Sequence, residues 1–292
     1  MLRNIIVVTV GILLFIVLCV RGTAQPRIQE QTSNFKGPVG LQLYSLRKEF
    51  SQDVTNALAE AQGFGIRDVE LSGNYGLAPE TFKQLLEAHK LNAIAGQFPY
   101  ERFRDDPDGV ASEANKLGLR YACCAWIPHI GDFNEKDCRL AIQTFNTAGA
   151  VLAKHGVQIC YHTHGFEFQP YGSGTLFDLL VSETNPKAVL LEMDVMWVYF
   201  AGQDPVKLIN KYGGRWRLMH LKDLKKGVTV GALTGQTDVA NDVVLGTGQI
   251  DWPPLLLAAK QAGIELYYIE DESPSAATQI PQSIKYLEKL KL

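Results

Sequence analysis

The chain has 292 residues, of which 46% are hydrophobic and 20% are charged. This is the composition of an ordinary globular protein with enough apolar residues for a sizeable core, arranged in one large domain or two small ones. The formal net charge is −3 and no basic patch stands out, which argues against nucleic acid as a partner.

The N-terminus has the layout of a secretory signal peptide. Arg3 precedes an apolar run over residues 5–20, and a step of small residues ends at Ala24. The run is shorter than the ~20 residues that a membrane span needs, so an uncleaved anchor is the less favoured alternative. Lipidation at Cys19 is disfavoured because Leu18 stands where a lipobox has a small residue.

We therefore expect residues 1–24 to be a cleaved signal peptide, residues 25–37 a linker and residues 38–292 a single folded domain. Such a protein would be exported to the periplasm or the extracellular space, with membrane contact only through the signal peptide. The cysteines that remain lack metal-ligand spacing such as C-x-x-C, and we expect buried thiols rather than a disulfide. These cysteines are Cys123, Cys124, Cys138 and Cys160.

From residue 38 onward, short β-rich runs alternate with longer amphipathic segments. The runs are apolar at both odd and even positions, which is typical of parallel strands that are buried on two faces. We predict strands over residues 39–45, 68–73, 92–98, 121–127, 158–164, 188–194, 217–223 and 266–271.

Helical patterns fill the intervals between these strands. They cover residues 53–65, 78–91, 135–156, 175–183, 205–212, 253–262 and 281–290. The alternation predicts a single (β/α)8 TIM barrel. A doubly wound sheet is the rival, but the chain contains no GxGxxG or GxxxxGK[ST] motif. Residues 225–250 form a long, polar, Gly-rich segment after the seventh strand, and loops of this length are often functional.

The predicted strands end in polar side chains, at the end of a TIM barrel where chemistry takes place. A charge at the end of an apolar strand is costly unless it is paired or ligated. The last four strands end in residue types that suit a divalent cation with mixed nitrogen and oxygen ligands, such as Mn²⁺, Co²⁺, Mg²⁺ or Zn²⁺. The strand-end residues are Glu70, Trp126, His129, His162, His164, Glu167, Glu192, Asp194, His220, Lys222, Asp223, Glu270, Asp271 and Glu272.

A structural polar network is the simpler alternative for these residues. Glu192 and Asp194 share one side of their strand, so we expect only one of them to reach a metal. The combination of Asp194, His220 and Glu270 nevertheless favours a metal site, because three neighbouring strands supply these residues at the same end.

Four motifs of the second half stand in order: YHTHGFEF, LLEMDVMWV, GQDPVKLINKYGGRWRLMHLKDL and VVLGTGQIDWPPLLLAAKQAGIELYYIEDE. They resemble the sugar phosphate isomerase/epimerase-like family, the xylose-isomerase-like TIM barrels, and the resemblance runs from about Val39 to the C-terminus. It implies a single (β/α)8 barrel with a divalent metal at its C-terminal mouth, commonly held by a Glu-Asp-His-Glu set from strands five to eight.

The resemblance implies metal ligands one residue at a time. The Asp of the set matches Asp194, the His matches His220 and the last Glu matches Glu270. The strand-five position departs from the family pattern, because YHTHGFEF offers His162, His164 or Glu167 in its place. The expected ligand there is Glu167, with His164 next.

The resemblance also implies proton transfer next to the carbonyl of an open or oxidised sugar, through a metal-stabilised enediolate. Glu270 and Glu167 are the expected catalytic carboxylates. Lys222 would stabilise the negative charge on a substrate oxygen or protonate a leaving group. The alternative is that Lys222 lies on the surface and has no catalytic role. The expected substrate-binding residues are Glu70, Trp126, His162, His164 and Trp197.

These features predict a divalent-metal-dependent sugar isomerase or epimerase. An exported lyase or hydrolase of 3-keto-glycosides with the same chemistry is the alternative, favoured somewhat by export because sugar phosphates are cytosolic metabolites. A non-catalytic carbohydrate-binding barrel is less favoured, since sugar binding alone does not need a metal triad. The net charge of −3 argues against a DNA-repair endonuclease of related fold. The sugar, the metal and the oligomeric state stay open.

Overall fold

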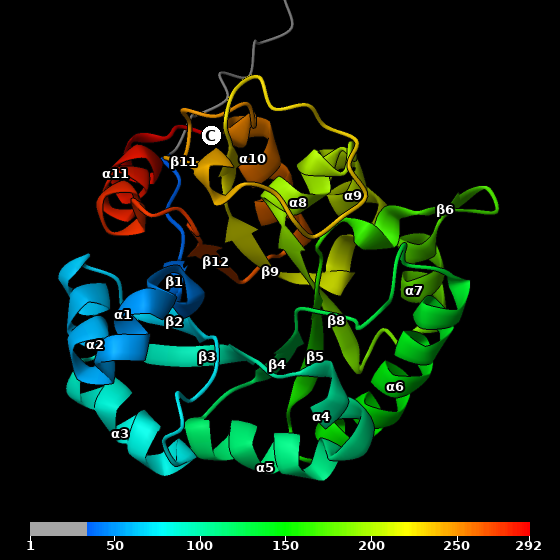
Figure 1. The fold of residues 1–292 in the computed structure, drawn as a ribbon, viewed down its shortest axis with the longest axis horizontal. Coiled ribbons are helices and arrows are strands. Elements are labelled where there is room, and N and C mark those ends of the chain that lie inside the picture. Colours follow the sequence, from blue (N-terminus) through cyan, green and yellow to red (C-terminus); the bar gives the residue numbers. More distant parts are fainter. Residues whose placement is uncertain (1–33) are drawn as a thin grey trace, which may run out of the picture. The chain divides into compact units, whose positions relative to one another are not determined.

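The computed structural model describes residues 34–292, so the predicted signal peptide and the linker as far as residue 33 lie outside the described residues. Parallel strands close into a barrel with helices around it, as Figure 1 shows, and the (β/α)8 prediction is confirmed. Around the barrel the strands follow the order β1 (Val39–Gln42), β12 (Leu266–Ile269), β9 (Trp216–Leu221), β8 (Val189–Asp194), β5 (Gln158–His162), β4 (Tyr121–Cys124), β3 (Asn92–Gln97) and β2 (Asp68–Leu71).

The helices form the outer ring. They are α1 (Arg47–Gln52), α2 (Val54–Gly63), α3 (Pro79–Ala88), α4 (Tyr100–Asp105), α5 (Pro107–Leu117), α6 (Glu135–Lys154), α7 (Leu176–Glu183), α8 (Val195–Phe200), α9 (Pro205–Tyr212), α10 (Trp252–Ala262) and α11 (Ala276–Lys289). Two short antiparallel pairs complete the fold: β6 (Pro170–Tyr171) with β7 (Gly174–Thr175), and β10 (Asp223–Leu224) with β11 (Asp242–Val243). None of the helices within residues 34–292 is long and apolar enough to cross a membrane.

Local signals fix where the outer helices begin. Asn134 and Asp137 form a capping box at the start of α6, and Thr175 and Asp178 form another at the start of α7. Each box satisfies backbone N–H groups that have no partner within the first turn of a helix. These caps fix the residues at which the helices that follow β4 and β7 begin.

The barrel interior is filled in layers, and this filling positions the site. A buried layer of apolar and small side chains comprises Ala95, Tyr121, Cys123, Cys160, Leu190, Leu218, Leu266 and Tyr268. Side chains two residues apart on a strand point the same way. The next inward-facing residues toward the C-terminal ends are therefore His162, Glu192, His220 and Glu270. The apolar layer closes the barrel beneath them, so the polar layer faces the open end.

The structure differs from the sequence predictions mainly at element ends. The strand β8 ends at Asp194 as predicted, and the other barrel strands stop one to three residues earlier; β1, for example, ends at Gln42 and a 3-10 turn follows over Leu43–Leu46. Helix α5 was not among the predicted ranges, although Asp106 caps it and Pro107 opens it. The predicted free thiols are buried, as expected.

The last part of the predicted linker lies against the end of the domain. Asn34 forms an isolated antiparallel bridge with Lys291, and the backbone N–H of Phe35 donates to the carbonyl of Leu290 at 2.8 Å. The Phe35 ring packs edge-on against Tyr267, with ring centroids 5.1 Å apart. The first described residues thus contact the C-terminal residues beside β12.

Candidate active site

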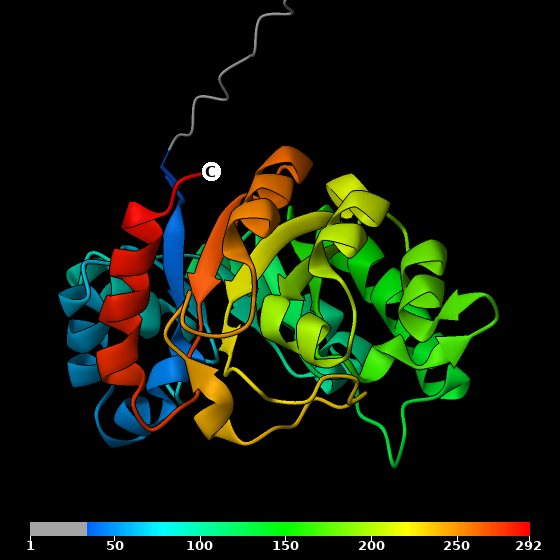
Figure 2. The same ribbon diagram turned by 90° about the horizontal axis from the view of Figure 1, so that it is seen from above.

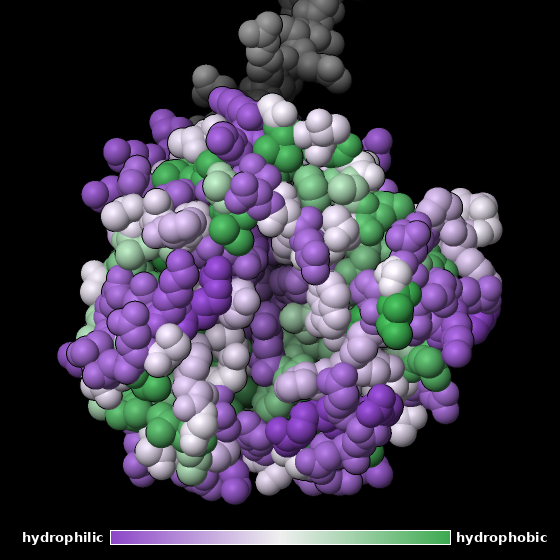
Figure 3. Space-filling view, in the orientation of Figure 1, coloured by the Kyte–Doolittle hydropathy of each residue, from purple (hydrophilic) through white to green (hydrophobic). Residues whose placement is uncertain are grey.

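A cavity of about 590 Å³ opens at the C-terminal end of the barrel. Figure 3 shows the hollow at the centre of the ring, between mostly hydrophilic residues. The segment between β9 and α10 crosses this end, as Figure 2 shows, and supplies part of the wall. The lining residues are Tyr44, Gln97, Ala125, Trp126, His162, His164, Trp197, Gly235, Gln236, Thr237, Val239, Asp242, Glu270 and Glu272.

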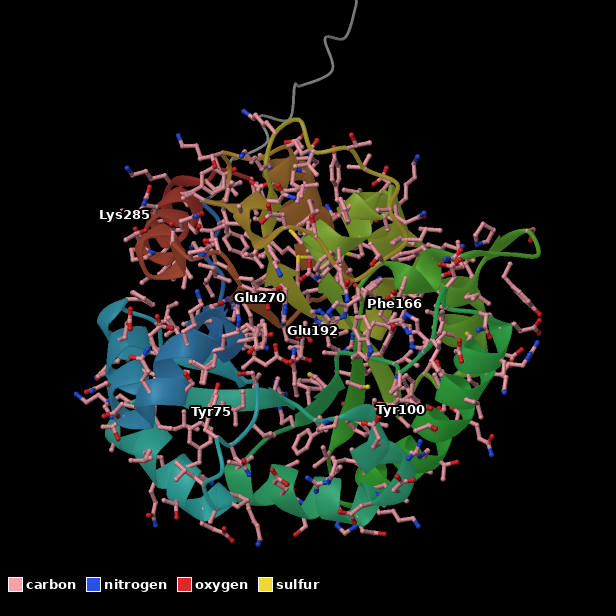
Figure 4. The ribbon with its side chains drawn as sticks, in the orientation of Figure 1. Tyr75, Tyr100, Phe166, Glu192, Glu270 and Lys285 are labelled. Atoms are coloured by element: carbon pink, nitrogen blue, oxygen red, sulfur yellow. The ribbon has the colours of Figure 1, made fainter. Side chains whose placement is uncertain are left out.

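His220 lies beneath the lining residue Glu270 of this cavity, between two carboxylates. Its Nδ1 is 2.8 Å from Oε2 of Glu270, and its Nε2 is 2.6 Å from Oε2 of Glu70. His220 and Glu70 are completely buried, and Glu270 is nearly so. Figure 4 shows Glu270 pointing into the centre of the barrel, where Glu192 also lies.

His162 makes a similar arrangement on β5. Its Nδ1 is 3.1 Å from Oε2 of Glu192, and its Nε2 faces Oδ2 of Asp194 at 4.0 Å. Asp194 itself caps α8, because its Oδ1 accepts from the backbone N–H of Trp197 at 2.9 Å. The second carboxylate oxygen of Asp194 is thereby left facing His162.

Two irregularities in the barrel aim the carboxylates of this site. The register between β2 and β3 shifts between Val69 and Glu70, and the register between β8 and β9 shifts between Leu191 and Glu192. Such irregularities re-aim side chains next to functional sites. Here each shift falls immediately before a buried glutamate.

Three buried carboxylate oxygens in this region have no hydrogen-bond partner: Oε1 of Glu70, Oε1 of Glu192 and Oδ2 of Asp194. An unpaired buried carboxylate oxygen is costly, and a cation is the most effective compensation. Within the described residues, ligand atoms of Asp194, His220 and Glu270 lie within 4.8 Å of one another, and so do those of His162, Glu192 and His220. A third such group is Glu70, Cys123 and Glu192. The side chains therefore fit a divalent cation.

The carboxylates also set the protonation of the cluster. Burial lowers the pKa of His220, but the charges of Glu192 and Glu70 outweigh it and raise this pKa well above its usual range. Burial raises the pKa of Glu70 to about 7, and repulsion from Glu192 adds to the effect. Without a metal, protons supply the positive charge that the cluster needs.

Lys222 is a buried cation beside this cluster, not a surface lysine. Its Nζ contacts Glu272 and lies 3.7 Å from Asp242 and 3.9 Å from Glu270. The ammonium also lies 5.3 Å from the ring centroid of Trp197. Burial lowers the pKa of Lys222, but the surrounding carboxylates raise it well above the usual value. Lys222 therefore stays charged and can donate a proton or a hydrogen bond.

The expected strand-five ligand Glu167 lies away from the cluster. Its Oε1 accepts from the backbone N–H of His164 at 3.0 Å, and its Oε2 accepts from that of Gly165 at 2.7 Å. Glu167 is absent from the three candidate ligand groups. The chain turns at Gly165, whose φ of +106° suits glycine, and this turn brings the carboxylate back onto the amides.

His164 faces the cavity above the cluster. Its ring lies 5.8 Å from that of Trp197 and 5.4 Å from that of Trp126. Burial lowers the pKa of His164 well below its usual value, and the charge of His162 adds to this. His164 is therefore neutral, and its buried Nδ1 has no partner within residues 34–292.

The structure brings most of the expected substrate-binding residues to one cavity. His162, His164, Trp126 and Trp197 line it, whereas Glu70 lies beneath it and contacts His220. Eight other lining residues were not predicted from the sequence: Tyr44, Gln97, Ala125, Gly235, Gln236, Thr237, Val239 and Asp242. Sequence features could have indicated two of these residues, because Gln97 lies near the end of a predicted strand and Gly235 lies in the long Gly-rich segment.

Comparisons with known proteins agree with the fold. The inosose dehydratase of Clostridium botulinum (strain Alaska E43 / Type E3) is 25% identical over 270 residues, covering 78% of this chain and 86% of that protein. A sugar phosphate isomerase/epimerase structure from Parabacteroides distasonis has a TM-score of 0.70 at 25% identity, covering 89% of this chain and 96% of that one.

A crystal structure of IOLI protein with a binding zinc atom shares the fold, with a TM-score of 0.65 at 14% identity over 85% of this chain and 95% of that one. A sequence profile of the xylose isomerase-like TIM barrel matches residues 58–290. The match covers most of the described barrel, and the chain belongs to the xylose isomerase-like TIM barrel family.

Proposed function

We propose that this protein is a divalent-metal-dependent isomerase or epimerase that removes a proton from the carbon next to a carbonyl group of a small carbohydrate. The observation that carries the proposal is the buried cluster of Asp194, His220 and Glu270, whose ligand atoms converge within 4.8 Å and whose Glu270 lines an open cavity. The names of the relatives, sugar isomerases and dehydratases, support carbohydrate as the substrate class.

We assign the strand-five ligand to His162 in place of Glu167 or His164. The Nδ1 of His162 is held by Glu192, which leaves Nε2 facing the unpaired Oδ2 of Asp194. In metal sites the second nitrogen of a ligating histidine commonly donates to a carboxylate, which fixes its tautomer. Glu192 would have this role for His162.

The same rule applies to His220. Glu70 holds Nε2 of His220, so we assign ligation to its Nδ1, whose carboxylate neighbour Glu270, at 2.8 Å, is itself a proposed ligand. The proposed ligands are therefore His162, Asp194, His220 and Glu270. Mixed nitrogen and oxygen ligands suit Mn²⁺, Co²⁺, Zn²⁺ or, less well, Mg²⁺.

When bound, the cation supplies positive charge that stabilises the negative charge developing on the substrate oxygens. The chain supplies the proton chemistry. Glu270 is the candidate base, because its carboxylate lines the cavity and stays ionised: burial raises its pKa, but Lys222 and His220 lower it overall. Lys222, 3.9 Å from Glu270, is a fixed donor to the oxygen that gains charge.

Elimination is the second candidate reaction, and the protonated Lys222 favours it. A lyase must stabilise the negative charge on the group that leaves, and a buried ammonium beside the proton-abstracting carboxylate can donate a hydrogen bond to it. The name inosose dehydratase, borne by the Clostridium botulinum relative, is consistent with elimination. We also propose export of the protein, which rests on the N-terminal sequence alone.

One experiment tests metal dependence and proton abstraction together. The purified protein is analysed for bound metal, stripped with chelator and reloaded, and the exchange of carbon-bound protons with D₂O is followed across keto-sugars and 3-keto-glycosides. We expect metal-dependent exchange that Glu270→Gln abolishes and that Glu87→Gln, an exposed change on α3, retains. Exchange that persists in Glu270→Gln would contradict the site, and a protein without metal and without exchange would contradict the function.

A further inference from the structure

A second hollow lies beside the metal-side cavity, and the two share a wall. Its volume is about 360 Å³, and its lining includes Ser72, Phe98, Tyr100 and Glu101. Both hollows are also lined by Gln97, Ala125 and Trp126, so the second continues from the first across the ends of β3 and β4.

Trp126 forms the most prominent part of the shared wall. Its side chain is 39% exposed, one of the few large apolar groups open to solvent within the described residues. The ring is held in place, because it stacks on His129 at 5.3 Å and packs edge-on against Phe166 at 4.9 Å. A fixed, partly exposed indole offers a flat apolar surface to a ligand at low entropic cost.

The segment between β9 and α10 closes on the same ring. A Cβ added at Gly235 would lie 2.7 Å from Cζ3 of Trp126 and 3.1 Å from Cδ2 of His164, which is closer than side-chain atoms pack. Gly235 thus lets this segment touch Trp126 directly. The wall between the hollows is therefore built around residues 97, 125 and 126, and the segment at residue 235 packs against it from the metal-side cavity.

The volume of the metal-side cavity exceeds what a single sugar ring requires. At ~30 Å³ per water, about 590 Å³ corresponds to roughly twenty water molecules, whereas a hexose has about a dozen non-hydrogen atoms. The second hollow adds further space beyond Trp126. A ligand of two sugar rings, with one ring on each side of Trp126, would fill both the metal-side cavity and the second hollow.

The charges of the lining exclude an anionic ligand. Neither hollow is lined by a lysine or arginine among the described residues, while Asp242, Glu270 and Glu272 line the first and Glu101 lines the second. The nearby Lys222 is already engaged with Glu272 and lies close to Asp242. The carboxylates of the two linings outnumber this ammonium, so a phosphate group would face a net negative surface, which costs free energy in a partly buried site.

We propose that the second hollow is a binding subsite for the second ring of an uncharged glycoside, with Trp126 as the platform between the two rings. The proposal rests on the proposed function only in placing the reacting ring in the metal-side cavity. It assigns the substrate class as a neutral two-ring glycoside, in contrast to a sugar phosphate.

Equilibrium binding tests this proposal separately from catalysis. The metal-loaded protein is titrated by calorimetry with unoxidised probes that the proposed reaction does not consume: glucose, galactose and glucose 6-phosphate against cellobiose, maltose, lactose and trehalose. We expect at least one two-ring sugar to bind about tenfold or more tightly than its component monosaccharide, and glucose 6-phosphate to bind no more tightly than glucose. Equal affinity for one and two rings, or preference for the phosphate, would overturn the proposal.

Variants then locate the second ring. Trp126→Ala should reduce the two-ring to one-ring affinity ratio to about one, whereas Trp126→Phe should keep most of the preference. Leu257→Ala, which shortens an exposed side chain on α10 outside both hollows, should leave the ratio unchanged. An unchanged ratio in Trp126→Ala, with folding verified by circular dichroism, would overturn the proposal.

The two proposals can fail separately. Two-ring preference without D₂O exchange would refute the proposed function alone, and exchange without the preference would refute the subsite alone.

Discussion

Nε2 of His220 lies 2.6 Å from Oε2 of Glu70, although 150 residues separate the two in the chain. Their strands β9 and β2 are not neighbours, because β12 and β1 stand between them in the barrel. The contact therefore crosses the barrel interior, where both side chains are completely buried. It joins the first half of the barrel to the metal-side residues of the second half.

This contact predicts that Glu70→Gln weakens metal binding. The glutamine keeps the shape of the side chain but loses the charge that orients the His220 ring and increases its basicity. Loss of such an outer carboxylate typically costs about 10- to 100-fold in metal affinity, and we expect a loss of this size for Mn²⁺ or Co²⁺. Calorimetric titration of the stripped protein measures it. Glu87→Gln is the matched control, and equal affinities in the two variants would contradict the assignment.

The assignment of the strand-five ligand predicts different effects for two histidines of one motif. His162→Ala should weaken binding of Co²⁺ by about tenfold or more and alter its visible absorption, because a nitrogen ligand is lost. His164→Ala should leave the absorption spectrum of the bound ion nearly unchanged, since His164 belongs to none of the three candidate ligand groups. The reverse pattern would return the ligand role to His164.

The sequence was sufficient to predict the barrel and three residues of the cluster, for a physical reason. Strands of a closed parallel sheet are apolar on both faces, and their C-terminal ends meet at one mouth, so Asp194, His220 and Glu270 could be grouped from strand ends alone. The contact between Glu70 and His220 could not be predicted, because it depends on barrel closure and on a register shift beside Glu70.

The position of Glu167 could not be predicted for a different reason, because it depends on a local turn. The strand-five motif drew attention to this glutamate, but the turn at Gly165 brings its carboxylate onto the amides of His164 and Gly165. A hydrogen bond across two or three residues competes with a ligand role at the barrel mouth, and no feature of the sequence indicates which of the two is stronger. The Glu167 ligand role stays a prediction that this geometry does not support.

Tyr268 predicts a specific loss of stability at alkaline pH. Its hydroxyl is buried beneath the cluster without a hydrogen-bond partner, and burial, together with the charge of Glu70, raises its pKa well above 10.0. Above pH ~10 the unfolded chain releases this proton and the folded chain retains it, so stability falls as pH rises. Tyr268→Phe should show a smaller loss of unfolding free energy between pH ~8 and pH ~10.5 in urea titrations. These two pH values lie on either side of the ordinary tyrosine pKa of about 10.

The matched control for this comparison is Tyr44→Phe, because the Tyr44 side chain is 41% exposed. This variant should follow the alkaline behaviour of the unmodified protein. Tyr268→Phe should also be at least as stable as the unmodified protein at pH ~8, because an unpaired buried hydroxyl is removed. Identical pH profiles for Tyr268→Phe and the unmodified protein would rule out this origin of the alkaline loss.

Asp223 anchors the segment that closes over the cavity, and it predicts an effect on stability without any contact with the cavity. Its Oδ2 accepts from the N–H of Gly246 at 2.8 Å and from the indole N–H of Trp252 at 3.0 Å. The same oxygen accepts from Gly248 at 3.2 Å, and Oδ1 accepts from Ile250 at 3.3 Å. One buried carboxylate thus satisfies four donors on the return path from the cavity wall to α10.

Asp223→Asn turns one acceptor into a donor and leaves at least one of these buried N–H groups unpaired. We expect a loss of about 1–3 kcal/mol in the free energy of unfolding, measured by urea titration, and faster proteolysis within residues 225–250. Asp251→Asn is the control, because Asp251 is exposed at the start of α10 and makes no capping hydrogen bond with its side chain. If both variants unfolded at the same urea concentration, the anchoring role of Asp223 would be refuted, because of these two carboxylates it is that of Asp223 that accepts the four hydrogen bonds from this segment and α10.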